Sequence, residues 1–116
     1  MIIEIQTNNR QFMFDLLNKQ VVSIGDSIDI PGNAKLTWNS SIGVKSVGIP
    51  DHIKLILEFG EGVLIEVVAN WLYNKLKKEK NNIKTVTINR KTVEIEEGEI
   101  KKVIEENINS REESYF

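Results

Sequence analysis

The chain has 116 residues, of which 41% are hydrophobic and 28% charged, and its formal net charge is −2. This length suits one domain with a modest core, and the composition excludes wholesale disorder and a strongly basic nucleic-acid scaffold. The absence of cysteine excludes disulfides, thiolate nucleophiles and sulfur-bound metals.

The sequence shows no sign of export or of membrane insertion. The first twenty residues lack a basic start and a sustained apolar run, so we expect no secretory signal. The most apolar region, residues 53–76, is interrupted by charged and amide side chains, which excludes a membrane span. We therefore expect a soluble, cytoplasmic protein that does not bind a membrane.

The N-terminal third predicts a strand and then a short helix. Residues 2–6 alternate between apolar and polar side chains, as a half-buried strand does. Either Asn8 or Asn9 can cap the following helix, and Asn18 can end it. Four apolar residues at helical spacing predict this helix: Phe12, Met13, Leu16 and Leu17.

Residues 21–47 predict two or three antiparallel strands, because short apolar pairs alternate there with turn residues. Three turns are predicted: Gly25-Asp26, Pro31-Gly32-Asn33 and Asn39-Ser40-Ser41. Residues 52–59 fit both a strand and a helix, and we slightly favour a helix that begins near Pro50 and Asp51.

The second half predicts a helix, a hairpin and a last helix. After Gly60-Glu61-Gly62, one broad apolar helix face is formed by Leu64, Ile65, Val68, Ala69, Leu72 and Leu76. A loop at Arg90-Lys91 would set Ile88 opposite Val93 and Val86 opposite Ile95. The last helix has an acidic first turn and an apolar stripe of Ile100, Val103, Ile104 and Ile108.

These elements predict one α+β domain over residues 1–109, followed by a flexible C-terminal tail at residues 110–116. We expect a mostly antiparallel sheet with two to four helices packed on one face.

No catalytic constellation is visible in the sequence. His52 is the sole histidine, and no serine lies in a G-x-S-x-G motif. Gly60-Glu61-Gly62 lacks the third glycine of a dinucleotide fingerprint, and Glu61 would repel a phosphate. We therefore predict that the protein is not an enzyme and has no catalytic residues, no cofactor and no metal site.

One basic and aromatic cluster lies between Trp71 and Lys91. Cations beside aromatic rings are typical of nucleic-acid binding, but lysines at a helix C-terminus and a core tryptophan explain the same pattern. We favour the structural explanation because the net charge is negative. The candidate partner surface within this cluster comprises Tyr73, Lys77, Lys78, Lys80, Arg90 and Lys91.

Residues 50–108, about half the chain, contain a characteristic order of apolar, glycine-rich, basic and acidic segments. An apolar segment ends in Phe59-Gly60-Glu61-Gly62, and an apolar helix then closes in Trp71-Leu72 before a basic run. Two strands and a short acidic helix follow the basic run. This pattern resembles the effector-associated constant component domains of bacterial conflict systems. The helix here carries lysines and Asn70 where the family is typically rich in alanine and arginine.

The resemblance implies a non-enzymatic adaptor that binds an effector protein in antiviral defence or another conflict between bacteria and phage. An inhibitor encoded by a phage or mobile element, which would bind a host protein, is the first alternative. A small nucleic-acid-binding module is the second. A protein partner is therefore expected ahead of nucleic acid, and the sequence leaves open whether the protein forms a homo-oligomer.

Overall fold

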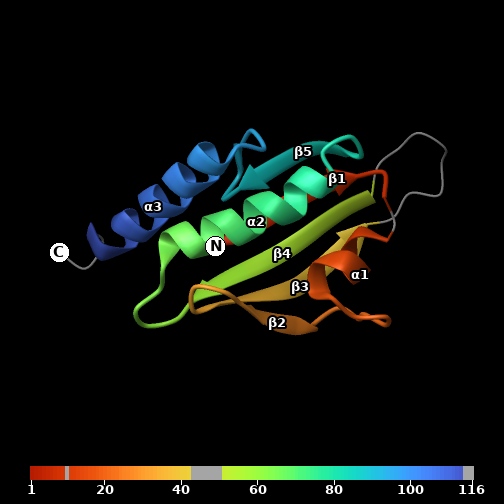
Figure 1. Ribbon diagram of the computed structural model, residues 1–116, viewed down its shortest axis with the longest axis horizontal. Helices are drawn as coiled ribbons and strands as arrows, with labels where there is room; N and C mark the ends of the chain where they lie inside the picture. The colour runs from red at the N-terminus through yellow and green to blue at the C-terminus, as the bar shows by residue number, and fades with distance from the viewer. Residues whose placement is uncertain (10, 43–50, 114–116) are drawn as a thin grey trace.

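The chain forms an antiparallel sheet with helices on one face, as the computed structural model in Figure 1 shows. The structure describes residues 1–9, 11–42 and 51–113. Along them the elements are β1 (Ile2–Thr7), α1 (Phe12–Leu17), β2 (Ser27–Ile30), β3 (Ala34–Ile42), β4 (Asp51–Phe59), α2 (Ile65–Lys78), β5 (Ile83–Ile88), β6 (Lys91–Thr92) and α3 (Glu97–Glu113). The strand order is β2-β3-β4-β1-β5-β6, and all neighbouring strands pair antiparallel. The predicted α+β fold is confirmed.

The N-terminal strand β1 lies in the middle of the sheet, between β4 and β5. Its residues Ile3 and Ile5 are fully buried, whereas Ile2 on the other face is 37% exposed. Ile3 stands opposite Leu55 of β4 and Ile88 of β5, so apolar side chains form a continuous row across three strands. The strand predicted from the alternation of residues 2–6 is confirmed.

The helices lie on the sheet face that carries Ile3 and Ile5 (Figure 1), and their apolar faces are buried in the core there. Helix α2 connects β4 to β5 and crosses in front of β1. The fully or almost fully buried helix residues are Phe12, Met13, Leu16 and Leu17 of α1, Val68, Ala69, Leu72 and Leu76 of α2, and Ile100, Val103 and Ile104 of α3. Leu64, which the sequence places on the apolar face, is instead 59% exposed.

Asn18 ends the short helix α1 as predicted, but the expected cap at Asn8 or Asn9 is wrong, because Gln11 is the N-cap residue and its side chain makes no capping hydrogen bond. The Asn9 side-chain oxygen accepts a hydrogen bond from the Gln11 backbone N–H at 2.9 Å, just before the helix begins. Asn18 ends the helix in the left-handed conformation, with φ at 53°, and its backbone N–H donates to the Phe14 carbonyl. Asparagine tolerates this conformation better than most residues, which explains why the helix stops here.

The helix favoured for residues 52–59 is wrong, because this segment is strand β4. Ile53, Leu55 and Leu57 are buried on the helix-covered face. The strand pairs with β1 on one side and β3 on the other, so tertiary pairing decides between two patterns that fit equally well locally. Asp51, expected in the first turn of a helix, begins the strand, and residues 48–50 lie outside the described part of the chain.

Strand β3 runs through the turn expected at Asn39-Ser40-Ser41, so that prediction is wrong. The pairing with β4 shifts between Trp38 and Ser40, which is how a β-bulge accommodates an extra residue without ending a strand. Val21 lies in no strand and is 79% exposed. The described part of this region therefore has two strands, β2 and β3, within the predicted range of two or three.

The predicted hairpin exists, but its loop is Asn89-Arg90 and its first pair is Ile88 with Lys91. Both loop residues have positive φ, 48° and 69°. The register therefore differs by two residues from the prediction, which leaves each side chain on its expected face. Val93, whose N–H donates to the Val86 carbonyl at 2.9 Å, is accordingly buried.

Helix α3 packs beside α2 and continues to Glu113. It therefore extends past residue 109, where the flexible tail is expected to start, and residues 114–116 lie outside the described part of the chain. One ion pair joins the two helices: Lys101 Nζ lies 2.7 Å from Glu66 Oε1. The hydrogen bond and the positive charge of Lys101 lower the pKa of Glu66, and Glu66 raises the pKa of Lys101 in return.

We predict that Arg90→Gly stabilises the protein by about 0.5–1 kcal/mol. A non-glycine residue is disfavoured at positive φ, and Asn-Gly is a preferred pair in a two-residue hairpin loop. Urea denaturation would measure the change. Lys91→Gly, one residue further along in β6, is the matched control and should destabilise, because glycine weakens a strand. Equal effects of the two substitutions would contradict this account of the loop.

We predict that Glu66→Gln removes part of the acid sensitivity of the fold. The folded-state pKa of Glu66 is lowered, so its pair with Lys101 stabilises the protein above the unfolded-state pKa of about 4.3. This contribution is lost as the pH falls through the lower folded-state pKa. Thermal melting between about pH 2 and 7 should show a shallower decline for Glu66→Gln than for Glu61→Gln, a control in the preceding turn. Parallel declines would contradict the role of the pair.

Candidate functional site

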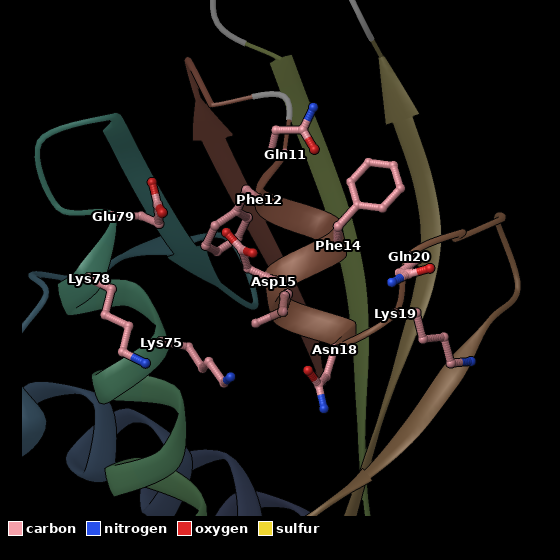
Figure 2. A pocket seen from close by; sticks show the side chains of 11 residues that line it. Gln11, Phe12, Phe14, Asp15, Asn18, Lys19, Gln20, Lys75, Lys78 and Glu79 are labelled. Atoms are coloured by element: carbon pink, nitrogen blue, oxygen red, sulfur yellow. The ribbon is translucent and has the colours of Figure 1, made fainter.

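A groove of about 1000 Å³ runs between α1 and the C-terminal end of α2 (Figure 2). We term it the α1–α2 groove. Its apolar part comes from α1, where Phe12 and Leu16 are buried and Phe14 is half-buried. Figure 2 shows Phe14 extending from the side of α1 away from α2, so the hollow continues around the exposed surface of the short helix.

Hydrogen bonds around Glu79 hold the two walls of the groove together. The Asn9 side-chain amide, just before α1, donates to Glu79 Oε2 at 2.8 Å. The Asn82 amide donates to the same oxygen at 3.1 Å. Glu79 is the C-cap residue of α2, so the start of α1 is fixed to the end of α2. The two helices then run in opposite directions along the groove (Figure 2).

The charged side chains that face one another across the groove come from both walls. Lys75 and Lys78 extend from α2 toward α1, where Asp15 and Asn18 lie (Figure 2). Lys75 Nζ also lies 5.7 Å from the centre of the Trp71 ring, within the range of a cation–π contact. Within the described part of the chain, no ion pair engages Lys78 or Asp15. Their charges remain open to a bound partner.

The structure divides the candidate partner surface predicted from the sequence. Only Lys78 of that set lines the α1–α2 groove. Tyr73 is half-buried, and Lys77 Nζ lies 5.7 Å from the centre of its ring. Lys80 is exposed just before β5 and lines a smaller hollow there, of about 200 Å³.

The other two residues of the set lie at the opposite end of β5. Arg90 is exposed in the β5–β6 loop. Lys91 Nζ lies 3.5 Å from Glu106 Oε2 of α3, so part of its charge is compensated within the chain. A cluster that is continuous in sequence is therefore separated in space by the length of a strand.

Sequence reasoning missed the α1 wall of the groove. Asp15, Lys19 and Gln20 lie about 60 residues before the lysines of α2, and no local pattern relates the two segments. The sequence indicates Asn18 only as the end of a helix. The contact depends on the Asn9–Glu79 hydrogen bond, which no motif in the sequence indicates.

His52 lies outside the groove, on the sheet face that the helices leave uncovered. Its Nε2 is 2.8 Å from Glu4 Oε2 on the neighbouring strand β1. In the described part of the chain, no group of three or more histidine, cysteine, aspartate or glutamate side chains could hold a metal ion. The groove therefore offers amide groups and unpaired charges, with the half-buried Phe14 beside them as an accessible apolar side chain.

Comparisons of this chain with protein-family models, curated proteins and solved structures found no match. Among the described residues, no helix has both the length and the apolar character that crossing a membrane requires.

We predict that Glu79→Ala destabilises the protein by about 1–2 kcal/mol, because two amide donors lose their acceptor. Glu79→Gln keeps one acceptor oxygen and removes a negative charge from the C-terminal end of a helix, so it should cost less. Urea denaturation would measure both variants, and NMR shifts of α1 would report any loosening of the groove. An alanine variant as stable as the parent would contradict the role of Glu79 in fixing α1.

Proposed function

We propose that the protein is a non-catalytic protein-binding domain and that the α1–α2 groove is its binding site. The observation that carries this proposal is the lining of the groove. Lys78 and Asp15 stand on opposite walls without ion-pair partners in the described chain, and the half-buried Phe14 extends from the same short helix as Asp15. Protein–protein interfaces combine charged and polar groups with apolar contact.

The chemistry of the lining favours a protein over a small molecule. Small-molecule sites are mostly apolar and carry a few placed polar groups. In the α1–α2 groove most lining side chains are charged or amide groups, including Asp15, Lys19, Lys75, Lys78 and Glu79. Such groups remain hydrated in the free protein and can pair with the charges of a partner surface.

The biological setting of the proposal is a bacterial or phage conflict system, in which the domain acts as an adaptor for an effector protein. This part rests on the sequence resemblance of residues 50–108. An inhibitor encoded by a phage or mobile element could use the same groove, since both roles require a protein partner and no catalysis. The two roles differ in the partner, which would be an effector in the first and a host protein in the second.

The test uses the proteins encoded beside the gene of this chain. Each is purified and titrated against the whole chain by isothermal calorimetry, and one should bind with a Kd of about 1 μM or less. The double variant Lys75→Glu/Lys78→Glu should weaken binding at least about tenfold, because it reverses the charge of the α2 wall. The matched control Lys84→Glu/Lys102→Glu reverses the charge of two exposed lysines outside the groove. Its Kd should stay within about twofold of the parent value.

Two outcomes would contradict the proposal. Equal effects of the two double variants would place the binding site elsewhere, and the absence of any binding neighbour would remove the adaptor role. Labelled oligonucleotides form a further arm at two salt concentrations. Sub-micromolar binding that falls with a log–log slope near −0.9 per phosphate contact, and that Lys77→Glu/Lys78→Glu abolishes, would establish a nucleic-acid-binding module instead.

A further inference from the structure

One flank of α2, together with its N-cap residue Leu64, carries a stripe of five residues that begins apolar and ends basic. In chain order these are Leu64, Val67, Trp71, Lys75 and Lys78, which we term the α2 stripe. The residues recur at intervals of three or four, so they follow one side of the helix. Lys75 and Lys78 line the α1–α2 groove, and the apolar members therefore extend that wall toward the start of α2.

The opposite flank of α2 is already occupied. Glu66 pairs with Lys101 of α3 at 2.7 Å, and the Asn70 amide donates to Glu97 of α3 at 3.1 Å. The α2 stripe lies on the side away from these contacts. On this flank Leu64 and Val67 are exposed, whereas Trp71 packs against the core with part of its surface.

Two of the three apolar members of the α2 stripe are exposed. Leu64 is 59% exposed and Val67 is 39% exposed, while Trp71 is half-buried. The neighbouring Val68 and Leu72 are fully buried and already attach α2 to the sheet. Contiguous exposed apolar side chains with a polar border mark interaction sites more often than scattered ones do.

We infer that the α2 stripe binds an amphipathic helix of a partner protein, antiparallel to α2, with acidic residues in its first turn and apolar residues in the turns that follow. This inference rests on the proposed function and specifies the partner of the same site. The stripe spans about 21 Å, because each helical residue rises 1.5 Å, and a partner helix of about 15 residues would cover it.

Charge complementarity selects both the acidic end and the direction of this helix. Lys75 and Lys78 place positive charge at the C-terminal end of the stripe, and no stripe residue is acidic. Aspartate or glutamate stabilises the first turn of a helix, so the acidic end of a partner is favourably its N-terminal end. Placing that end on the lysines makes the two helices antiparallel.

A second copy of the chain does not satisfy this requirement. Two α2 stripes facing each other would bring lysines from both copies to the interface and supply no carboxylate from the stripe itself. The partner we infer is therefore a different protein, whose helix is recognised through apolar anchors at intervals of three and four residues.

The inference can be tested with peptides, since the natural partner is unidentified. A phage-displayed library of helical peptides of about 15 residues is selected on the immobilised whole protein, and enriched peptides are titrated by fluorescence anisotropy. Enriched sequences should carry Asp or Glu in the first turn and apolar residues in the next turns. A peptide with the reversed order, acidic at its C-terminal end, should bind at least about tenfold more weakly.

Variants locate the binding on the α2 stripe. Val67→Glu should weaken binding of the enriched peptides at least about tenfold. Val21→Glu, the same change at a more exposed valine, should leave their Kd within about twofold of the parent value. Lys78→Glu gives an independent test that leaves the apolar stripe intact. Lys78→Glu should weaken the binding of acidic peptides about tenfold. The binding of their glutamine analogues should weaken less than about twofold.

Three outcomes would overturn the inference: no enrichment, enriched peptides without an acidic first turn, or equal effects of Val67→Glu and Val21→Glu. The proposed function is judged separately. If the binding of a partner protein requires Lys75 and Lys78 but is unaffected by Val67→Glu, the groove binds a protein without the inferred helix. If stripe-dependent peptides are found and no neighbouring gene product binds, the adaptor role fails and the helix-binding surface stands.

Discussion

The pairing of β1 on both of its edges is the constraint on which the rest of the structure depends. Strands β2, β3 and β4 form one consecutive unit and β5 with β6 forms another, and β1 joins the two units by pairing with β4 and β5. Because β4 and β5 are both antiparallel to β1, they are parallel to each other, and their connection must cross the sheet. Helix α2 is that connection, which places it over the buried residues Ile3 and Ile5.

The position of α2 determines where a binding site can form. Helix α3, 17 residues long, packs on one flank of α2. Helix α1 has six residues, and Asn9, just before it, is hydrogen-bonded to Glu79 at the C-terminal end of α2. The difference in length leaves the α1–α2 groove at one end of α2. It also leaves Leu64 and Val67 exposed at the other end. The unequal cover of α2 by its two neighbours therefore creates both parts of the proposed surface.

The sequence predicts those features that depend on neighbouring residues. Local spacing predicts the alternation in β1 and the buried face of α2 through Val68 and Leu72. The residue type alone predicts the end of α1 at Asn18. Residues 52–59 satisfy both helical and strand spacing, and only pairing with β1 and β3 resolves them. The groove is less predictable still, because its walls lie about 60 residues apart in the chain. Conversely, Lys78 and Arg90 are close in sequence but lie beyond opposite ends of β5.

The exposed part of α2 is not required by the fold. Its apolar attachment to the core comes from four buried residues, including Val68 and Leu72, and from partly buried side chains that include Trp71. Leu64 and Val67 are not among them, so polar side chains at these two positions would leave the core unchanged. Exposing apolar surface costs about 25 cal/mol per Å² relative to covering it. The free chain bears that cost at Leu64 and Val67, and a partner that covers them would recover it on binding. Burial of Leu64 and Val67 can therefore stabilise a complex with a partner. The neighbouring Lys75 and Lys78 favour a partner surface that is negatively charged.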